Sequence, residues 1–343
     1  MDSKQTKDNK TCKKGVSVAI CCHNSAKVLP DTLNYIKKQN VPKNISWEVI
    51  VVDNGSADNT AEVAQQCWLK DAPASLKVVS APQIGLVYAR YKAFEESRYE
   101  FISFIDDDNW VNPDWVKIIF EVMTKHPFVG ACGSFVEPVF ESEPPEWFES
   151  CKNAYAVGPQ GKPGDITEAK GRLVGAGLTI RKDAWQQLIN LGFSNMLIGH
   201  KGKSLSRGED TELCYALRLA GWKLWYEPGL RLKHYLSSDR LQWRHLRRLR
   251  RGGGRASVAF DAYFAALNKN DRVKFKQDWK SQALVVMMSL SSQPIKLFSS
   301  FFPALEGNKE VLLIEKNIGR LLELLKKRKE YNKSFEKIDG IFI

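Results

Sequence analysis

The sequence predicts an α/β fold, in which a mostly parallel sheet is flanked by helices and followed by a basic helical C-terminal extension. Short apolar runs alternate with helical patterns between Val16 and Lys125. Acidic or amide side chains directly follow three of these runs. Alternation of this kind indicates right-handed strand–helix–strand units, which build a parallel sheet.

The expected elements follow one another regularly in the first part of the chain. Strands are expected at residues 16–22, 47–53, 76–80 and 101–105, and helices at residues 29–39, 58–68, 85–96 and 112–125. Leu29, Leu33 and Ile36 recur at helical spacing and indicate the first helix. The segment 137–172 is rich in Pro, Gly and Glu, so we expect a long surface loop there.

The later part is less regular. A strand is expected at residues 175–180, a mobile lid at 199–208, a helix at 211–220 and two short strands at 222–226 and 230–235. The expected division is a disordered polar N-terminus (1–14), one α/β domain (15–236) and a basic helical region (237–343).

Charge is unevenly distributed along the chain. The net charge is +12, and residues 231–343 carry 24 Lys and Arg against 11 Asp and Glu. The first 230 residues are almost neutral, with 27 basic and 28 acidic side chains. A basic segment of this size suits an anionic partner such as a membrane surface, a nucleic acid or a phosphorylated substrate.

The cysteines and the N-terminus predict the compartment. Seven cysteines are present without a CxxC pair, which favours reduced thiols. Residues 1–15 are polar and lack the apolar core of a signal peptide, and no apolar run is long enough to span a bilayer. We therefore expect a cytoplasmic protein, with peripheral attachment to the inner face of the membrane left open.

Three consecutive acids, Asp106, Asp107 and Asp108, end the apolar run 101–105. Unpaired charges are costly away from water, so we expect the acids at the open end of a buried strand. Oxygen-rich sites of this type hold Mg²⁺ or Mn²⁺, usually together with substrate phosphates. The alternative is a solvated acidic turn, because Asp and Asn favour turns.

Two further strand ends are polar, with His23 and Asn24 after the first strand and Asp53 and Asn54 after the second. In parallel sheets, ligands bind outside the carboxyl ends of the strands. The three strand ends therefore predict one shared site. The alternative for the first two is ordinary turn chemistry, with Asn or Asp capping the next helix.

Five motifs occur in order over residues 14–236. They are Val16–Asn24, Glu48–Thr60, Gly85–Arg90, the acids Asp106–Asp108, and Gly208–Asp210 at a helix start. In this order they resemble the family 2 glycosyltransferases with the Rossmann-like GT-A fold, which invert the configuration of the transferred sugar. The resemblance implies a nucleotide-diphosphate sugar donor, Mn²⁺ or Mg²⁺ as cofactor, and a saccharide or lipid-linked acceptor.

The resemblance also assigns the donor side of the site. The implied donor contacts are Cys21, His23, Asn24, Asp53, Asn54, Arg90, Asp106 and Asp107, and the implied metal ligands are Asp108, Asp106 and His234. Asn54 stands where family members often carry a second acid, which leaves the base open. Arg90 could instead be a helix-surface residue, and His234 could be structural. Asp107 points to the opposite face from its neighbours, so we expect it to tolerate substitution best.

On the acceptor side, the resemblance makes Asp210 the general base that deprotonates the acceptor hydroxyl. Glu209, Trp147 and Gly177 are expected to line the acceptor pocket. The alternatives are an acid pair that favours the helix dipole, for Glu209 and Asp210, and ordinary core packing, for Trp147.

The basic region has two open interpretations. Seven arginines lie between Arg240 and Arg255, in a stretch that ends in three glycines. Residues 282–290 and 295–305 are apolar, and residues 308–329 suggest a basic amphipathic helix. The region either packs on the catalytic core as a helical subdomain or associates with a membrane. Gln242 and Trp243 faintly resemble the QxxRW motif of processive synthases in this family. The spacing does not match and no transmembrane helices follow, so we do not expect a processive enzyme.

The leading hypothesis is an inverting glycosyltransferase of cell-surface polysaccharide or lipopolysaccharide synthesis. The alternative is a non-enzymatic basic protein that binds nucleic acid or membrane on a degenerate fold. Nucleic acid is not expected, because the arginine cluster lacks interleaved aromatic side chains. A metal-dependent phosphotransferase or nuclease would show more metal ligands or a phosphate-binding loop.

Overall fold

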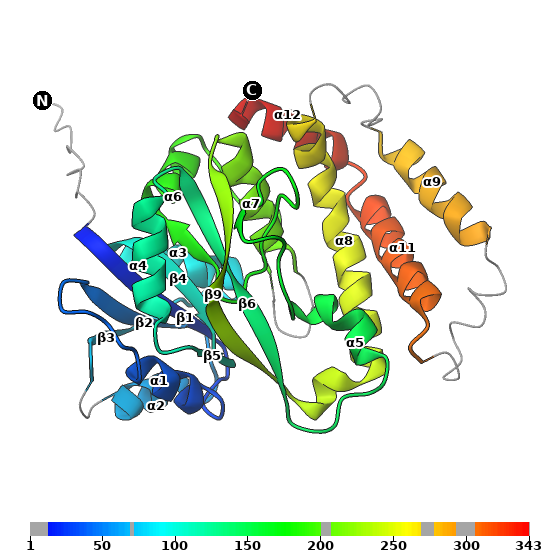
Figure 1. The fold of residues 1–343 in the computed structure, drawn as a ribbon. Helices are drawn as coiled ribbons and strands as arrows, with labels where there is room; N and C mark the ends of the chain where they lie inside the picture. The colour runs from blue at the N-terminus through cyan, green and yellow to red at the C-terminus, as the bar shows by residue number, and fades with distance from the viewer. Residues whose placement is uncertain (1–12, 69–71, 200–206, 269–277, 293–305, 343) are drawn as a thin grey trace, which may run out of the picture.

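The computed structural model describes residues 13–68, 72–199, 207–268, 278–292 and 306–342. The described strands form one nine-stranded sheet in the order β3-β2-β1-β4-β8-β6-β9-β5, with β7 also paired to β9. The strands are β1 (Lys13–Cys22), β2 (Trp47–Asp53), β3 (Ser75–Ser80), β4 (Tyr99–Asp106), β5 (Asn109–Val111), β6 (Val129–Phe140), β7 (Gly164–Asp165), β8 (Thr179–Arg181) and β9 (Lys223–Leu236). The expected α/β fold with a mostly parallel sheet is confirmed (Figure 1).

The described helices lie on both faces of the sheet and beyond one side of it (Figure 1). They are α1 (Leu29–Lys37), α2 (Thr60–Trp68), α3 (Leu86–Glu96), α4 (Trp115–Lys125), α5 (Phe148–Cys151), α6 (Lys182–Asn190), α7 (Glu209–Leu219), α8 (Trp243–Leu267), α9 (Trp279–Ser291), α11 (Lys309–Lys326) and α12 (Tyr331–Phe342). Short 3₁₀ helices occupy Lys152–Tyr155 and Ser238–Leu241. None of these helices is long and apolar enough to cross a membrane.

Strand alternation divides the core between the two faces of the sheet. Val18 and Ile20 of β1 pack into the cluster that contains residues of α1, α2 and α4, whereas Ala19 packs into the cluster with α3, α6 and α7. This follows because successive side chains of a strand point to opposite faces. Strands β1, β2 and β4 are buried on both sides, which explains why they are continuous apolar runs in the sequence.

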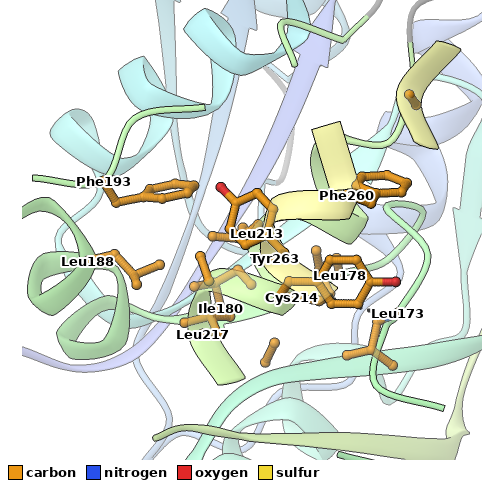
Figure 2. Packing of buried hydrophobic residues seen from close by; sticks show 14 of the residues in the cluster. Leu173, Leu178, Ile180, Leu188, Phe193, Leu213, Cys214, Leu217, Phe260 and Tyr263 are labelled. Atoms are coloured by element: carbon orange, nitrogen blue, oxygen red, sulfur yellow. Dashed lines mark hydrogen bonds between the residues drawn. The ribbon is translucent and has the colours of Figure 1, made fainter. Parts of the chain in front are cut away.

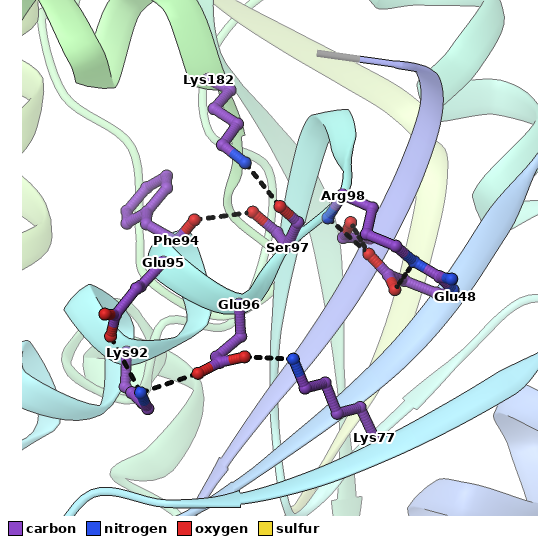
Figure 3. A network of polar contacts seen from close by, with 10 residues as sticks. Glu48, Lys77, Lys92, Phe94, Glu95, Glu96, Ser97, Arg98 and Lys182 are labelled. Atoms are coloured by element: carbon purple, nitrogen blue, oxygen red, sulfur yellow. Dashed lines mark hydrogen bonds and ion pairs between the residues drawn. The ribbon is translucent and has the colours of Figure 1, made fainter. Parts of the chain in front are cut away.

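The amino ends of the central strands are held together by a network of polar contacts (Figure 3). Glu48, which is 2% exposed, accepts hydrogen bonds of 2.7 Å from both the backbone N and the Nε of Arg98. Lys182 donates to the carbonyl oxygen of Ser97 at 2.5 Å, and Glu96 pairs with Lys92 at 2.7 Å. The charged side chains named at this edge are therefore paired with one another.

Helix α8 joins the C-terminal region to the α/β core. Phe260 and Tyr263 of α8 share a hydrophobic cluster with Leu213 and Leu217 of α7 (Figure 2). The Tyr263 hydroxyl also donates to buried Glu212 at 3.0 Å. This part of the basic region therefore packs on the α/β core, as one of the two sequence interpretations expected.

Helices α8 and α11 are in backbone contact. A Cβ added to Gly254 would lie 1.9 Å from the carbonyl oxygen of Lys316, so only glycine fits there. Buried Glu315 of α11 pairs with Arg247 and Arg251 of α8 at 2.7 and 2.6 Å. The three consecutive glycines lie inside α8, where close packing against α11 offsets the low helix propensity of glycine.

Several expected boundaries also differ. Residues 222–226 and 230–235 form the single strand β9, and the expected loop 137–172 includes the end of β6 together with α5 and β7. The strand expected at 175–180 is confined to β8. The expected lid at 199–208 and the apolar segment 295–305 lie largely or wholly outside the described residues.

Candidate active site

The carboxyl ends of β1, β2 and β4 lie at one edge of the sheet. In the parallel registers, Cys22 is opposite Asp53 and Cys21 is opposite Asp106. A cavity of about 360 Å³ opens at this edge, and we call it the strand-end cavity. The predicted site residues in its lining are Cys21, His23, Asn54, Arg90, Asp106, Asp107, Asp108, Glu209, Asp210 and His234. Ten of the residues predicted from the sequence are thus brought together.

The turns after β1 and β2 are locked to each other. Asn24, with a positive φ of 57°, accepts a hydrogen bond of 2.7 Å from the backbone N of Ala57, and Asp53 accepts one of 3.1 Å from Ser56. Neither Asn24 nor Asp53 lines the cavity. Their assignment as donor contacts stays a prediction, and in the structure they build the turns.

Asn54 lies at the cavity but its side chain is fully engaged. Its Nδ2 donates to the carbonyl oxygens of Ala81 and Gln83, both at 2.8 Å, and its Oδ1 accepts from the backbone N of Gly85 at 2.7 Å. The amide therefore fixes the loop between β3 and α3. His23 contacts the carbonyl oxygen of Asn54 through Nδ1 at 2.9 Å.

The three consecutive acids have different environments. Burial, followed by the charge of Asp108, raises the pKa of Asp106 and raises that of Asp107 to about 7. Burial also opposes ionisation of Asp108, but His234 and Arg240 outweigh it and lower its pKa to about 2. The carboxylate of Asp107 accepts a hydrogen bond from the hydroxyl of Ser25. Asp108 is therefore the fixed negative charge of the triplet.

Strand β9 brings His234 beside Asp108, because the antiparallel register with β5 places His234 opposite Asn109. His234 Nδ1 lies 3.2 Å from the carbonyl oxygen of Tyr155. A carbonyl only accepts hydrogen bonds, so Nδ1 carries the proton and Nε2 faces Asp108. Metal-binding histidines usually donate the N–H of the nitrogen that does not bind the metal in this way, as Nδ1 of His234 does to the carbonyl oxygen of Tyr155.

A positive charge already lies between these two side chains. Asp108 Oδ2 and His234 Nε2 are 3.7 Å apart, and Arg240 Nη1 lies 2.6 Å from the first and 3.1 Å from the second. The guanidinium thus marks a position at which a cation is favourable. Carboxylate and imidazole suit Mn²⁺, and Mg²⁺ takes one or two carboxylates together with phosphates.

The residues fit a divalent metal that is shared with a substrate. In the described part of the chain, no three His, Cys, Asp or Glu side chains are grouped so that they could hold a metal ion by themselves. Asp108 and His234 would supply two ligands, with Asp106 nearby, and phosphate oxygens would supply others.

The start of α7 carries the second group of acids. Glu209 is 8% exposed and its Oε1 lies 3.6 Å from Nη1 of Arg90, which is 6% exposed. Burial and then the charge of Asp210 raise the pKa of Glu209 to about 7. Burial lowers the pKa of Arg90, but Glu209, Asp106 and Asp210 outweigh it, so the net shift is upward. The alternative that Arg90 is a helix-surface residue is wrong.

Gly175 forms the wall between Arg90 and Asp210. A Cβ added there would lie 2.8 Å from Arg90 Nη2 and 3.4 Å from Asp210 Oδ2, so a larger residue would fill the space beside both. Gly177, which the sequence suggested instead, has a positive φ of 70° and packs against buried Trp115 and Leu232.

A second cavity of about 590 Å³ adjoins the first, and we call it the helix-side cavity because α8 forms part of its wall. The two cavities share Ala154, Ala156, Arg207, Gly208, Asp210 and Leu249. Asp210 therefore lies at the boundary between them. The helix-side cavity was not predicted from the sequence, since its residues come from segments 153–161, 170–174 and 207–211 and from α8 and α11.

Trp147 does not line either cavity. Its Nε1 donates to Glu306 at 2.8 Å and its ring lies 5.6 Å from that of Trp243, so it anchors the C-terminal region. The expectation that Trp147 and Gly177 line an acceptor pocket is not met by this geometry.

Three residues that line or border the cavities were not predicted as site residues from the sequence, namely Arg240, Gly175 and Arg207. Only the arginine cluster pointed toward Arg240.

Comparisons with known proteins agree with this geometry. Residues 17–163 match the family model described as glycosyl transferase family 2. The chain is 25% identical over 239 residues to the succinoglycan biosynthesis protein ExoM of Rhizobium meliloti (strain 1021), covering 69% of this chain and 72% of that protein. It is 34% identical over 100 residues to the putative glycosyltransferase EpsH of Bacillus subtilis (strain 168), covering 29% of this chain but only 28% of that protein.

The fold is similar to that of solved structures of S. aureus TarS. Residues 1–349 of TarS give a TM-score of 0.51 at 18% identity, and the match covers 95% of this chain and 91% of that one. The same fragment in complex with UDP-GlcNAc gives a TM-score of 0.50 at 15% identity, with the same coverage. At these identities the likeness shows the fold alone, and it confirms the expected GT-A fold.

Proposed function

We propose that the chain, whose residues 17–163 match the model of glycosyl transferase family 2, is an inverting enzyme of that family that transfers a sugar from a nucleotide-diphosphate sugar to an acceptor hydroxyl. One observation carries the proposal: Asp210 lies where an acidic cavity that suits a metal and a diphosphate meets a second cavity with room for an acceptor. The comparisons support this interpretation and give no support to a non-enzymatic protein.

On the donor side, the residues of the strand-end cavity bind and orient the diphosphate. A divalent cation held by Asp108 and His234 would supply charge that stabilises the departing nucleoside diphosphate. Arg90 contributes a further positive charge, which is buried beside Glu209. UDP-sugars are the first donors to test, because the similar TarS fragment was solved with UDP-GlcNAc.

On the acceptor side, Asp210 takes the proton of the acceptor hydroxyl. The hydroxyl oxygen forms a bond to the anomeric carbon while the bond from that carbon to the diphosphate oxygen breaks. Because the acceptor enters from the other cavity, attack occurs opposite the leaving group and inverts the configuration. Glu209, with its pKa raised to about 7, can retain a proton near neutral pH, which removes a second negative charge from beside the base.

The acceptor we propose is a saccharide or a lipid-linked saccharide of surface polysaccharide synthesis. Peripheral contact with an anionic membrane belongs to the same proposal. Helix α9 exposes an apolar face, whose most exposed side chains are Leu284, Val285, Met287 and Met288. Apolar side chains beside a basic surface are typical of segments that lie in a membrane interface.

The test is turnover of a panel of nucleotide sugars with Mn²⁺ or Mg²⁺, in the wild type and in Asp108→Ala. We expect metal-dependent release of the nucleoside diphosphate, reduced at least 100-fold in Asp108→Ala. Asp183→Ala, at an exposed position of α6, is the matched control for loss of a carboxylate. Full activity of Asp108→Ala, or no turnover of any donor by the wild type, would contradict the proposal.

A further inference from the structure

The helix-side cavity carries a large excess of positive charge. The cations in its lining are Lys170, Arg172, Arg207, Arg250 and Lys316, and the one acid there is Asp210. Within the described ranges, none of these five cations lies within 4.0 Å of a carboxylate oxygen, the distance of an ion pair. Because they come from two separate loops, α8 and α11, they converge on the cavity only in the folded chain.

Helix α8 shows that this charge is not merely an arginine-rich surface. Arg247 and Arg251 turn inward to buried Glu315, whereas Arg250, on the adjoining face, lines the cavity. The Nε of Arg250 is buried and has no hydrogen-bond partner in the described structure. A buried donor without a partner is costly, so a ligand that accepts from it would recover that cost.

The cations of the helix-side cavity also repel one another. Burial and then the charge of Arg172 lower the pKa of Lys170. Burial also lowers the pKa of Arg207, and Arg250 acts in the same direction, against the opposite effect of Asp210. An anionic ligand placed among these side chains would remove the repulsion.

We propose that the acceptor carries a phosphate or diphosphate group close to the sugar that is extended, and that Arg172, Arg250 and Lys170 bind this group in the helix-side cavity. The inference rests on the proposed function, because it takes the acceptor to enter beside Asp210. Guanidinium groups bind phosphate oxygens in pairs, and a phosphate offers more acceptor oxygens than a carboxylate. A lipid-linked sugar diphosphate and a polyol-phosphate chain share this chemistry.

The test measures binding by calorimetry in the presence of saturating UDP, so that the strand-end cavity is filled. The probes are citronellyl diphosphate, its neutral alcohol citronellol, and a short glycerol-phosphate oligomer. We expect a phosphate-bearing probe to bind at least 10-fold more tightly than citronellol, and Arg172→Gln and Arg250→Gln each to weaken that binding at least 10-fold. Arg244→Gln, an exposed position of α8 outside both cavities, should bind as the wild type does.

The outcomes separate the two proposals. Tighter binding of the diphosphate indicates a lipid-linked acceptor, and tighter binding of the oligomer indicates a phosphodiester chain. Equal binding of charged and neutral probes, or unchanged binding by Arg172→Gln, overturns the inference. Arg172 is exposed, so that variant should fold even if Arg250→Gln does not. If no nucleoside diphosphate of a panel that includes UDP binds with Mn²⁺ or Mg²⁺, the proposed function fails, while the probes without nucleotide still test the charge of the helix-side cavity.

Discussion

The strand-end cavity and the helix-side cavity meet at Asp210 but carry opposite unmatched charges. The first gathers five acids, and one of them, Asp108, has a pKa of about 2 and holds its charge. Its cations are Arg90, Arg207 and Arg240, of which Arg240 pairs with Asp108 at 2.6 Å. The helix-side cavity has five cations and Asp210 alone as an acid.

The opposite charges of the two cavities indicate what each one requires from its ligand. An acidic cavity can hold an anionic diphosphate only if further positive charge arrives with it, and a divalent cation supplies that charge. A basic cavity needs an anion, which the acceptor itself can supply. Asp210 lies between the two and is therefore exposed to both ligands. The boundary between opposite charges is where proton removal and bond formation would take place.

The largest effect that separates the two cavities is expected for Asp210→Asn. An amide cannot take the proton of the acceptor hydroxyl, so transfer should fall by about 10³-fold, within the range for removal of a general base. Donor affinity should change by less than about threefold, because the amide keeps the shape of the side chain. Initial rates of transfer and calorimetry with the donor measure the two effects.

The control for this prediction is Asp239→Asn, at an exposed position that lines neither cavity. A fall in donor affinity as large as the fall in rate would mean that Asp210 belongs to the strand-end cavity alone. In that case another group would have to serve as the base.

The two cavities also differ in how far the sequence predicts them. Asp106, Asp108 and Arg90 lie in short motifs at strand ends and helix starts, where a local pattern suffices and parallel pairing brings the ends together. Arg172 and Arg250 converge through the packing of α8 and a loop, which no local pattern encodes. For Trp147 the sequence does not distinguish two roles, because an aromatic residue in a loop can either bind a sugar or pack against a helix, and no local pattern differs between the two.

A smaller effect is expected for Glu209, the acid that precedes Asp210 at the boundary between the two cavities. Glu209→Gln should change how stability depends on pH, because burial and Asp210 raise the pKa of Glu209 to about 7. The folded wild type keeps a proton that the unfolded chain loses above about pH 4.5. The contribution of Glu209 to the free energy of unfolding therefore falls as the pH rises from about 4.5 to about 7.

The Gln variant lacks this fall, so its stability relative to the wild type should rise over the same interval and then level off. The rise should be at most about 3 kcal/mol, from one pKa unit being worth 1.36 kcal/mol. Urea unfolding at pH 5, 6, 7 and 8 measures it. Glu95→Gln, an exposed position in α3, should show no such trend. A difference that shrinks with rising pH would show that the pairing of Glu209 with Arg90 dominates instead.

The smallest expected effect is a change in the affinity for Mn²⁺ when Arg240 is replaced, which tests whether Arg240 occupies the position of a metal. Nη1 of Arg240 lies 2.6 Å from Asp108 and 3.1 Å from His234, so a divalent cation at these ligands must first displace the guanidinium. Arg240→Met should therefore bind Mn²⁺ about fivefold more tightly than the wild type in the absence of nucleotide, about 1 kcal/mol. Electron paramagnetic resonance of free Mn²⁺ gives the affinity.

Arg207→Met separates displacement from a general loss of positive charge, because Arg207 lines the same cavity without a hydrogen bond to Asp108. Its affinity for Mn²⁺ should rise less than that of Arg240→Met. With UDP present, the gain from Arg240→Met should shrink or reverse, since the displaced guanidinium of the wild type can pair with the diphosphate. Equal gains in the two variants would show that Arg240 acts only through its charge. Weaker Mn²⁺ binding by Arg240→Met would show that it positions Asp108 and His234 for the metal.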